Sequence, residues 1–462
     1  MLCSFKDECK VMKAAITSLL LIFILFPGVD SRAASVFDYF ELANGLKVYL
    51  YQKPNLPIIN ISMGFNLGSK DESDETNGLV HLLEHYVLFR GSKSREEDEI
   101  VWDVRRHGAY FNAHTSYDVA LFEFSLLSKY MDFALENQKD ILFNLEITQD
   151  KLDEEKEILL QELNQIQDDP LKYATSLVYQ NLFKDHPYER PVYGKKEIIQ
   201  SATAGQLEKF YKTYFVPDNC SMAVVGDFDF KEIKVKIKNV FGPLPKTDFI
   251  PAHFEKASLL DKTVQIKKEM DVNNAYLVMG LAGPDYNHPD QYAVDVLVEI
   301  LGRGLNPMIN RLLRGRLNLV YSFSSSYVAM KYGGAILFFF TLDPKNMAVT
   351  KRKILDFLKQ AKTLNYSRKD YAGESRLTAY DYLASAKSQI RFKFHKTREE
   401  GLDIASSLVL HSLLNQNPSR VPYLDSIETT VTTDLRRVAG KYFAGGRSVF
   451  VSIVPQGKKK KR

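Results

Sequence analysis

The length, composition and charge of this chain exclude several classes of protein. At 462 residues it exceeds the size at which one hydrophobic core stops growing, so two domains of roughly 200 residues each are expected. With 45% hydrophobic, 12% aromatic and 26% charged residues, it is neither disordered nor fibrous. The net charge of +4 indicates no class of partner, and the basic tail at 458–462 lacks interleaved aromatics, so nucleic-acid binding is not expected.

The first 34 residues have the pattern of an export signal. Lys10 and Lys13 precede an apolar run at 14–26, and small residues follow at 31–34. The run is shorter than the roughly 20 residues that span a bilayer, which favours a cleaved signal over an anchor. We therefore expect a signal peptide at 1–34 and an exported mature chain, periplasmic or extracellular, with no stable membrane span.

Strands and helices alternate in the first half of the chain. Alternating apolar and polar residues indicate strands, and apolar residues spaced by three or four indicate helices. Asp168, Asp169 and Pro170 stop one of these helices. The predicted strands are 45–51, 58–65, 119–126 and 221–225, and the predicted helices are 77–90, 150–167 and 207–215.

The end of the first half is repeated at the end of the chain. Leu207 is followed seven residues later by Tyr214, as Leu435 is by Tyr442, and a predicted strand follows each time. This repetition indicates two related domains, and the mixture of elements favours an α+β fold of two homologous α/β sandwich domains in tandem. A Pro-rich stretch separates them. The predicted segments are an N-terminal domain at 35–240, a linker at 241–262, a C-terminal domain at 263–455 and a basic tail at 456–462.

A group of metal-binding side chains lies within the predicted helix at 77–90. His81 and His85 are four residues apart and share one helix face, so both imidazoles can reach one metal ion with Glu84 beside them. Imidazole nitrogen is a favoured zinc ligand, and a catalytic zinc has three protein ligands and a water. A third protein ligand is therefore required.

The predicted helix at 150–167 offers that ligand. Glu155 and Glu162 are two helical turns apart and project from nearly the same face. We assign Glu162 to the metal and Glu155 to the free ring N–H of a ligand histidine, and expect Glu154 and Glu157 to be solvated. Histidine and carboxylate ligands favour one Zn²⁺ per chain over other divalent ions.

This set of residues predicts peptide-bond hydrolysis. Zinc lowers the pKa of water towards about 7 and polarises a carbonyl, while Glu84 takes a proton from the attacking water and passes it to the leaving nitrogen. Two other interpretations remain open. A histidine pair on an apolar helix can be packed core, and a peptide-binding carrier would explain an export signal and two lobes, but not a glutamate between two histidines.

The sequence resembles the pitrilysin and insulinase family of zinc peptidases, the inverzincins, whose His-x-x-Glu-His signature matches residues 81–85. The resemblance extends over essentially the whole mature chain and suggests a half-size member similar to the mitochondrial processing peptidase-like branch. It implies two homologous α+β domains, of which only the first holds zinc. The further matching segments are Phe89-Arg90-Gly91-Ser92, 112–116, Glu155 with Glu162, 186–194, 216–219 and 225–227.

The resemblance also implies substrate-binding residues. The family's Arg and Tyr, which bind substrate and stabilise the developing oxyanion, match Arg314 and Tyr321, although Asn318 stands where the family usually has Gly. A second segment is similar to the family's substrate-binding edge, where an extended peptide adds to a sheet as a strand. Its residues are Phe111, Asn112, Ala113 and Thr115.

The resemblance further implies an assembly and an activity. Half-size members pair to close a four-domain chamber around a peptide, so this chain is expected to form half of a clam-shell, as a homodimer or with a related chain. The predicted function is a zinc-dependent endopeptidase acting on peptides or unfolded segments, with Glu84 as general base. The alternative is a non-catalytic family subunit that acts as a scaffold or peptide-binding partner of a related chain.

Overall fold

The computed structural model describes residues 36–304, 307–361, 378–414, 423–445 and 447–457. The chain divides into two units, 1–37 and 38–462, and the description below concerns the second. The predicted signal peptide and residues 458–462 of the predicted tail lie outside the described residues. No helix in the described part is long and apolar enough to cross a membrane.

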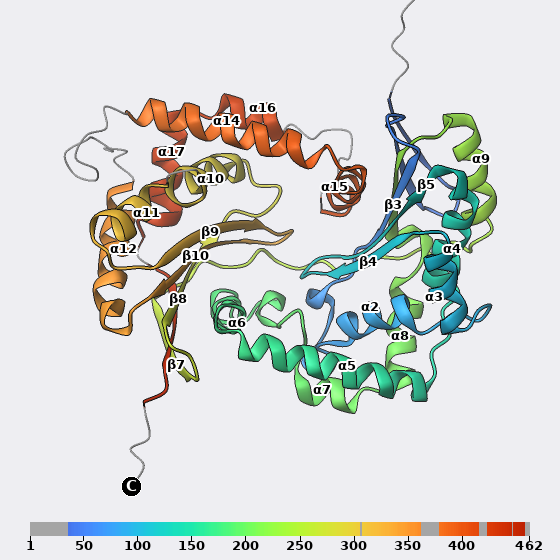
Figure 1. The fold of residues 1–462 in the computed structure, drawn as a ribbon, viewed down its shortest axis with the longest axis horizontal. Coiled ribbons are helices and arrows are strands. Elements are labelled where there is room, and N and C mark those ends of the chain that lie inside the picture. The colour runs from blue at the N-terminus through green and yellow to red at the C-terminus, as the bar shows by residue number, and fades with distance from the viewer. Residues whose placement is uncertain (1–35, 305–306, 362–377, 415–422, 446, 458–462) are drawn as a thin grey trace, which may run out of the picture. The chain divides into compact units, whose positions relative to one another are not determined.

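The first sheet has six strands in the order β1-β2-β6-β3-β5-β4 (Figure 1). β2 and β6 are parallel, whereas β3 is antiparallel to β6 and β5, and β5 is antiparallel to β4. β4 is the edge strand, because no further strand pairs with it in the described sheet. The strands are β1 (Phe37–Glu41), β2 (Lys47–Gln52), β3 (Ile58–Phe65), β4 (Tyr110–Thr115), β5 (Ala120–Leu127) and β6 (Cys220–Gly226).

A layer of helices covers one face of the first sheet. Alternate residues of the strands, such as Ile61 and Met63 on β3, are fully buried against it. The predicted helix at 150–167 forms as α5 and ends at Asp168, and α6 begins at Pro170 with Asp169 as its N-cap. The helices of this half are α2 (Leu79–Phe89), α3 (Glu97–Arg106), α4 (Met131–Phe143), α5 (Gln149–Asp168), α6 (Pro170–Leu182), α7 (Lys196–Ser201), α8 (Ala204–Tyr214) and α9 (Phe230–Phe241), with short turns η1 (Ser69–Asp71), η2 (Ser128–Tyr130), η3 (Pro187–Glu189) and η4 (Pro217–Asn219).

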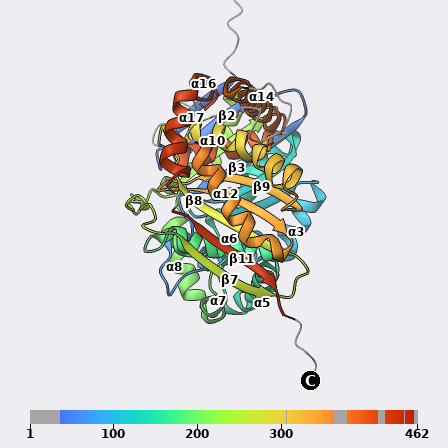
Figure 2. The same cartoon turned by 90° about the vertical axis from the view of Figure 1, so that its left-hand side faces the viewer.

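The five strands of the second sheet repeat the order of five strands of the first, and β1 has no counterpart in the described second sheet. Its order is β7-β11-β8-β10-β9, with β7 parallel to β11 and the other neighbours antiparallel. Figure 2 shows β7, β11 and β8 side by side. These strands take the places of β2, β6, β3, β5 and β4, which confirms the predicted α+β fold with two homologous domains. The strands are β7 (Val264–Met270), β8 (Ala275–Gly283), β9 (Ser322–Ala329), β10 (Gly334–Leu342) and β11 (Val449–Pro455).

Helices again cover one face of the second sheet. Leu277, Met279 and Leu281 of β8 alternate into this core. The stretch 242–263, between α9 and β7, contains neither helix nor strand, and Phe254 and Leu260 within it pack against the second sheet. The helices of this half are α10 (Asp290–Val298), α11 (Met308–Asn310), α12 (Met347–Ala361), α14 (Ala379–Thr397), α15 (Gly401–Leu414), α16 (Tyr423–Thr429) and α17 (Thr432–Val438), with turns η5 (Glu299–Arg303), η6 (Arg311–Arg316), η7 (Pro344–Asn346) and η8 (Ala439–Phe443).

The two halves exchange one helix each. α6 of the first half packs on β8 and β11, and α15 of the second half packs on β3 and β6. Each helix meets a glycine in the central strand. A Cβ on Gly64 would lie 2.5 Å from a methyl of Val409 on α15, and a Cβ on Gly280 would lie 2.3 Å from a methyl of Val178 on α6. The absent side chains therefore create the room that the exchanged helices occupy.

A buried polar joint connects the tips of the two edge hairpins. Asp118, in the turn between β4 and β5, accepts hydrogen bonds from the Tyr188 hydroxyl at 2.7 Å and from the backbone N–H of Lys331 at 2.9 Å. Lys331 lies in the turn between β9 and β10, and its neighbour Tyr332 donates its N–H to the Tyr188 hydroxyl at 3.0 Å. Because buried polar groups need partners, this network fixes one hairpin tip against the other.

Candidate active site

Helix α2 carries the His-x-x-Glu-His residues and is fixed at both ends. At its start, the buried Glu72 carboxylate accepts the N–H groups of Gly78 at 3.0 Å and Val80 at 2.8 Å, which satisfies donors that a helix N-terminus leaves free. At its end, Gly91 has φ +87°, a conformation open to glycine, and turns the chain towards α3. The helix packs against β4 and α5, the elements that carry the other candidate site residues.

The two imidazoles converge on one carboxylate oxygen. His85 Nε2 lies 3.3 Å and His81 Nε2 4.0 Å from Glu162 Oε2. The ring planes are nearly perpendicular, at 82°. Donors bound to one tetrahedral zinc at 2.0–2.2 Å lie about 3.4 Å apart, so these three side chains fit a zinc ion in both chemistry and spacing. Glu84 lies within the same group, with ligand atoms of His81, Glu84 and His85 all within 4.8 Å of one another.

The electrostatics of this group favour a bound cation. Burial lowers the pKa of His81 to about 4, which keeps its ring neutral as a ligand must be. Burial also opposes charge on His85, but its contacts with the Glu155 and Glu162 carboxylates raise its pKa to about 9. Burial raises the pKa of Glu84, a direction that suits a general base. The pocket thus stabilises positive charge close to His85, which a divalent ion could supply.

Glu155 contacts one histidine of the pair, His85. Its Oε1 lies 3.0 Å from His85 Nδ1, on the ring nitrogen that faces away from Glu162, and its Oε2 accepts Arg90 Nε at 2.7 Å. Glu155 is completely buried and Arg90 is 6% exposed. The side chain of Glu154 is 68% exposed, as expected for a solvated residue, and it also accepts a hydrogen bond from Arg90 Nη1 at 2.7 Å. Glu157 is exposed as well.

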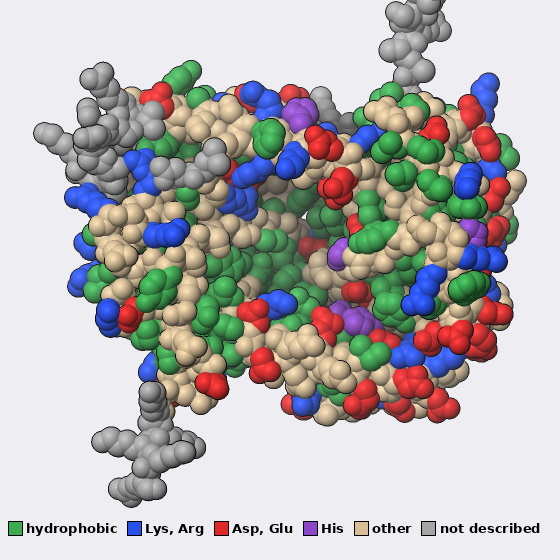
Figure 3. Space-filling model, viewed as in Figure 1, with side chains coloured by type: hydrophobic (Ala, Val, Ile, Leu, Met, Phe, Trp, Pro, Cys, Tyr) green, Lys and Arg blue, Asp and Glu red, His purple; other side chains and the backbone are tan. Residues whose placement is uncertain are grey.

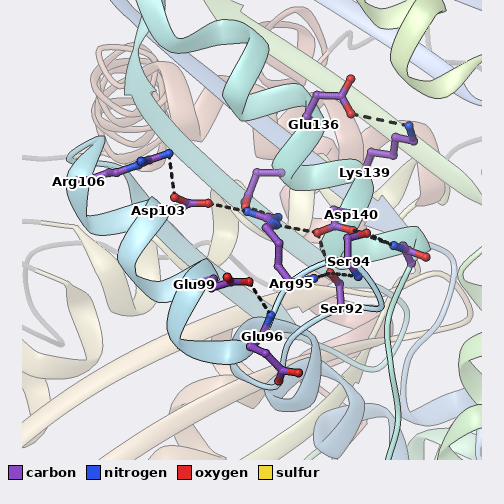
Figure 4. A network of polar contacts seen from close by, with 12 residues as sticks. Ser92, Ser94, Arg95, Glu96, Glu99, Asp103, Arg106, Glu136, Lys139 and Asp140 are labelled. Atoms are coloured by element: carbon purple, nitrogen blue, oxygen red, sulfur yellow. Dashed lines mark hydrogen bonds and ion pairs between the residues drawn. The ribbon is translucent and has the colours of Figure 1, made fainter.

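A polar network holds the loop that follows α2 (Figure 4). Arg95 donates to Asp140 at 2.9 Å, to Asp103 at 3.1 Å and to the amide oxygen of Asn137 at 2.9 Å. Ser92 donates to Asp140 at 2.7 Å. The loop is therefore fastened to both α3 and α4, and none of these contacts reaches the histidine pair.

The predicted substrate-binding residues lie on the edge strand β4. Ala113 is buried and Phe111 packs edge-to-face on Phe124, whereas the outer backbone edge of the strand has no paired strand in the described sheet. Asn112 lies on the other face, 3.1 Å from the ring of His114. Helix α2 packs against this strand, with Thr115 beside Glu84. In Figure 3, histidine and carboxylate side chains gather beside a hollow in the viewed face.

Arg314 and Tyr321 lie in the second half. Arg314 is exposed on η6, and Tyr321 is exposed just before β9. Among the residues that the structure describes, no hydrogen bond or ion pair joins either side chain to His81, Glu84 or His85. The single chain therefore brings together the residues of α2, α5 and β4, but not this pair.

Models of one peptidase family match both halves of the chain. The model described as insulinase (peptidase family M16) covers residues 47–196, and the one described as peptidase M16 inactive domain covers 201–373. The chain belongs to the insulinase family. This membership confirms the prediction made from the His-x-x-Glu-His signature and supports a peptidase-type enzyme.

Several curated relatives of this insulinase-family chain are named zinc proteases. An uncharacterised zinc protease of Rickettsia felis is 27% identical over 63% of this chain and 70% of its own length. Zinc protease PqqE of Helicobacter pylori is 25% identical over 90% of this chain and 92% of its own. A probable mitochondrial-processing peptidase subunit beta of Arabidopsis thaliana is 25% identical over 56% of this chain and 49% of its own.

Solved structures share the fold at low sequence identity. A protease from Helicobacter pylori has a TM-score of 0.83 at 23% identity and covers 91% of this chain and 99% of its own. The periplasmic protease PqqL from Escherichia coli has a TM-score of 0.71 at 19% identity, covering 91% of this chain but 48% of its own. The insulinase-family chain therefore has the length of half of PqqL.

The contacts of two residues at the site were not predicted from the sequence. Tyr193 of this insulinase-family chain places its ring 5.4 Å from that of His81 at 78°, and the signal for it was its place in the segment 186–194 that resembles the family. Arg90 was noted for its resemblance to the family but not for its contacts. Its place five residues after His85, at the end of the motif helix, is a signal that could have identified it.

Proposed function

We propose that this chain is a zinc-dependent endopeptidase, with one Zn²⁺ held by His81, His85 and Glu162. The observation that carries the proposal is the convergence of two imidazole nitrogens on one Glu162 oxygen, with Glu84 beside them. A packed-core histidine pair needs no such carboxylate. A peptide carrier needs no buried glutamate with a raised pKa between two histidines.

Each residue of the site has its own role in the proposed hydrolysis. Zinc, when bound, lowers the pKa of water and polarises the scissile carbonyl. Glu84 accepts a proton from the attacking water and delivers it to the leaving nitrogen. Glu155 contacts Nδ1 of His85, which leaves Nε2 of the same ring facing Glu162.

The substrate class follows from the open edge of β4. A peptide that extends the sheet beside Phe111, Asn112, Ala113 and Thr115 is bound mainly through its backbone, so the chain accepts peptides and unfolded segments with loose sequence preference. Arg314 and Tyr321, exposed on the second half, are proposed to bind substrate in the assembled enzyme. Because PqqL is about twice as long, we propose a pair of half-size chains, either two copies or this chain with a related one.

We further propose that residues 1–34 are an export signal and that the enzyme acts outside the cytoplasm. The mature chain would then comprise a zinc domain at 35–240, a connecting segment at 241–262 and a homologous domain at 263–455, followed by the tail at 456–462. The pattern of the first 34 residues supports export.

The test is metal content together with cleavage of an unstructured fluorogenic peptide by the mature chain and by Glu84→Gln. We expect one zinc per chain in both proteins, chelator-sensitive cleavage by the parent, and a loss of about 10³-fold in kcat for the variant. Cleavage by Glu84→Gln at the parent rate, or a parent without zinc, would refute the proposal.

The second candidate is a non-catalytic subunit of the same family. Two observations favour it: residues 201–373 match a domain described as inactive, and no described hydrogen bond or ion pair joins Arg314 or Tyr321 to the motif. Zinc binding without cleavage by the homogeneous chain, with cleavage restored by a related chain that carries its own intact motif, would support this candidate.

A further inference from the structure

The candidate metal site is linked to the end of its own helix by an arginine. Arg90 is the residue after α2, and its side chain turns back to place Nε 2.7 Å from Glu155 Oε2. The other oxygen of Glu155 contacts His85 Nδ1 at 3.0 Å. Arg90, Glu155 and His85 thus form a continuous chain of contacts from the loop to the ring.

This chain is buried and geometrically determined. Glu155 is completely buried, and Arg90 is 6% exposed. A carboxylate can rotate about its terminal torsion, so a contact on one oxygen alone leaves the other free to move. Because Arg90 holds Oε2, the carboxylate cannot rotate, and Oε1 stays directed at His85.

Arg90 is itself held from two sides. Its Nη1 contacts Glu154 at 2.7 Å and Glu97 at 3.3 Å, so α5 and α3 both restrain the guanidinium. A planar fork with several donors can satisfy all of these contacts at once, which an ammonium group cannot. The arginine therefore transmits the position of the α2–α3 loop to the metal-facing ring.

We propose that Arg90 is a positioning residue of the zinc site, acting through Glu155 on the orientation of His85. This inference rests on the proposed metallopeptidase function. Arg90 touches neither substrate nor metal. Its contribution is to keep Nε2 of His85 directed at Glu162 before zinc binds, so that the ion meets a preorganised pair of nitrogens.

The test measures zinc affinity by chelator competition, together with kcat and KM. Arg90→Met is expected to bind zinc about tenfold more weakly and to lose kcat while KM stays unchanged. Arg90→Lys keeps one donor for Glu155 and is expected to recover most of the lost affinity. Unaltered zinc affinity in Arg90→Met would overturn the inference.

Arg95→Met is the matched control. Arg95 lies in the same loop and also makes three polar contacts with neighbouring helices, but none with Glu155 or His85. We expect it to lower the melting temperature while zinc affinity stays within about twofold of the parent. A loss of affinity equal to that of Arg90→Met would show that loop stability alone is responsible, and would reject the positioning role.

A double-mutant cycle with Glu155→Gln separates action through Glu155 from any other effect. If Arg90 acts through Glu155, then Arg90→Met causes no further loss of zinc affinity in the Glu155→Gln background. Independent losses that simply add would overturn the proposal. A parent protein that binds zinc and cleaves peptide, with an Arg90→Met variant that does both equally well, rejects this inference but keeps the proposed function; a parent without zinc rejects both.

Discussion

The two halves of the chain share one strand order and differ in the helix that follows the central strand. After β3, α2 presents His81, Glu84 and His85 to β4 and α5. After β8, α10 runs into η5, where the buried Glu299 contacts Lys393 at 2.8 Å through both oxygens. The same scaffold thus carries a candidate metal-binding set of side chains in one copy and an ion pair in the other.

The sheet edges differ in the same way. The outer edge of β4 has no paired strand in the described sheet. At the corresponding edge of β9, Arg303 donates to the backbone oxygens of Ser325 at 3.4 Å and Tyr327 at 3.2 Å, and Asp295 holds the arginine at 2.8 Å. Among the described residues, the edge of β4 lies next to the candidate metal site and has no paired strand, whereas two backbone oxygens of β9 are already occupied by an arginine of their own half.

The largest difference between the two halves should appear when one side chain is replaced in each of the two equivalent helix regions. His85→Ala removes a proposed ligand, so zinc is lost and hydrolysis falls by about 10³-fold. Glu299→Gln removes only half of an ion pair and costs about 1 kcal/mol of stability, with zinc content and kcat kept. Metal analysis and peptide cleavage on both variants check this, and a loss of zinc in Glu299→Gln would contradict the division between the halves.

Because of the exchanged helices, replacing the glycine in the central strand should destabilise both halves equally. A methyl group on Gly64 or Gly280 would lie well inside contact distance of Val409 or Val178, so Gly64→Ala and Gly280→Ala should each destabilise the protein by about 3 kcal/mol. Gly205→Ala, with open space around it on α8, is the control and should stabilise by about 0.5 kcal/mol. Urea unfolding measures all three, and a neutral Gly280→Ala would show that the second half tolerates what the first does not.

The smallest expected effect concerns the carboxylates that hold the starts of α2 and α10. Burial raises the pKa of Glu72 to about 8, whereas for Asp290 hydrogen bonds from Arg437, Lys441 and Tyr442 outweigh burial and lower the pKa to about 2. A lowered folded-state pKa adds stability above the unfolded value near 4, and this stability is lost as pH falls towards 2. Asp290→Asn should therefore cost about 2 kcal/mol at pH 6 and progressively less below pH 4.

Glu72→Gln should show the opposite pH dependence. A raised folded-state pKa means that the stability contributed by Glu72 is full below the unfolded value near 4.5 and declines as pH rises towards 8. The variant lacks this titration, so its stability relative to the parent should improve between pH 5 and pH 8. Urea midpoints across pH 3 to 8 test both carboxylates, and parallel curves for the two variants would refute the contrast.

Local patterns in the sequence predicted the helices and strands, and also which side chains share a helix face. The predicted strand at 58–65 forms as β3 with the same bounds, and the predicted helix at 77–90 forms as α2 at 79–89. The four-residue spacing of His81 and His85 was enough to place both rings together. The metal role of these residues and of Glu162 stays a prediction.

Contacts between distant segments could not be predicted in this way. Nothing in the periodicity of α6 or α15 shows that each packs on the sheet of the other half, because an amphipathic helix specifies an apolar surface but not which one. The same holds for Arg90, whose partner Glu155 is 65 residues away in the sequence. The joint of Asp118 with Lys331 spans 213 residues and has no local signature at all.

The exchange of α6 and α15 also constrains how the protein is made. One face of the first sheet is covered at β3 and β6 only when residues 401–414 lie against it, so the half with the candidate metal site depends on a segment that comes much later in the sequence. Until then an apolar sheet surface stays uncovered, which favours a late, cooperative folding step and contact with chaperones. The candidate metal site is therefore expected to be fully formed only after both halves have folded together.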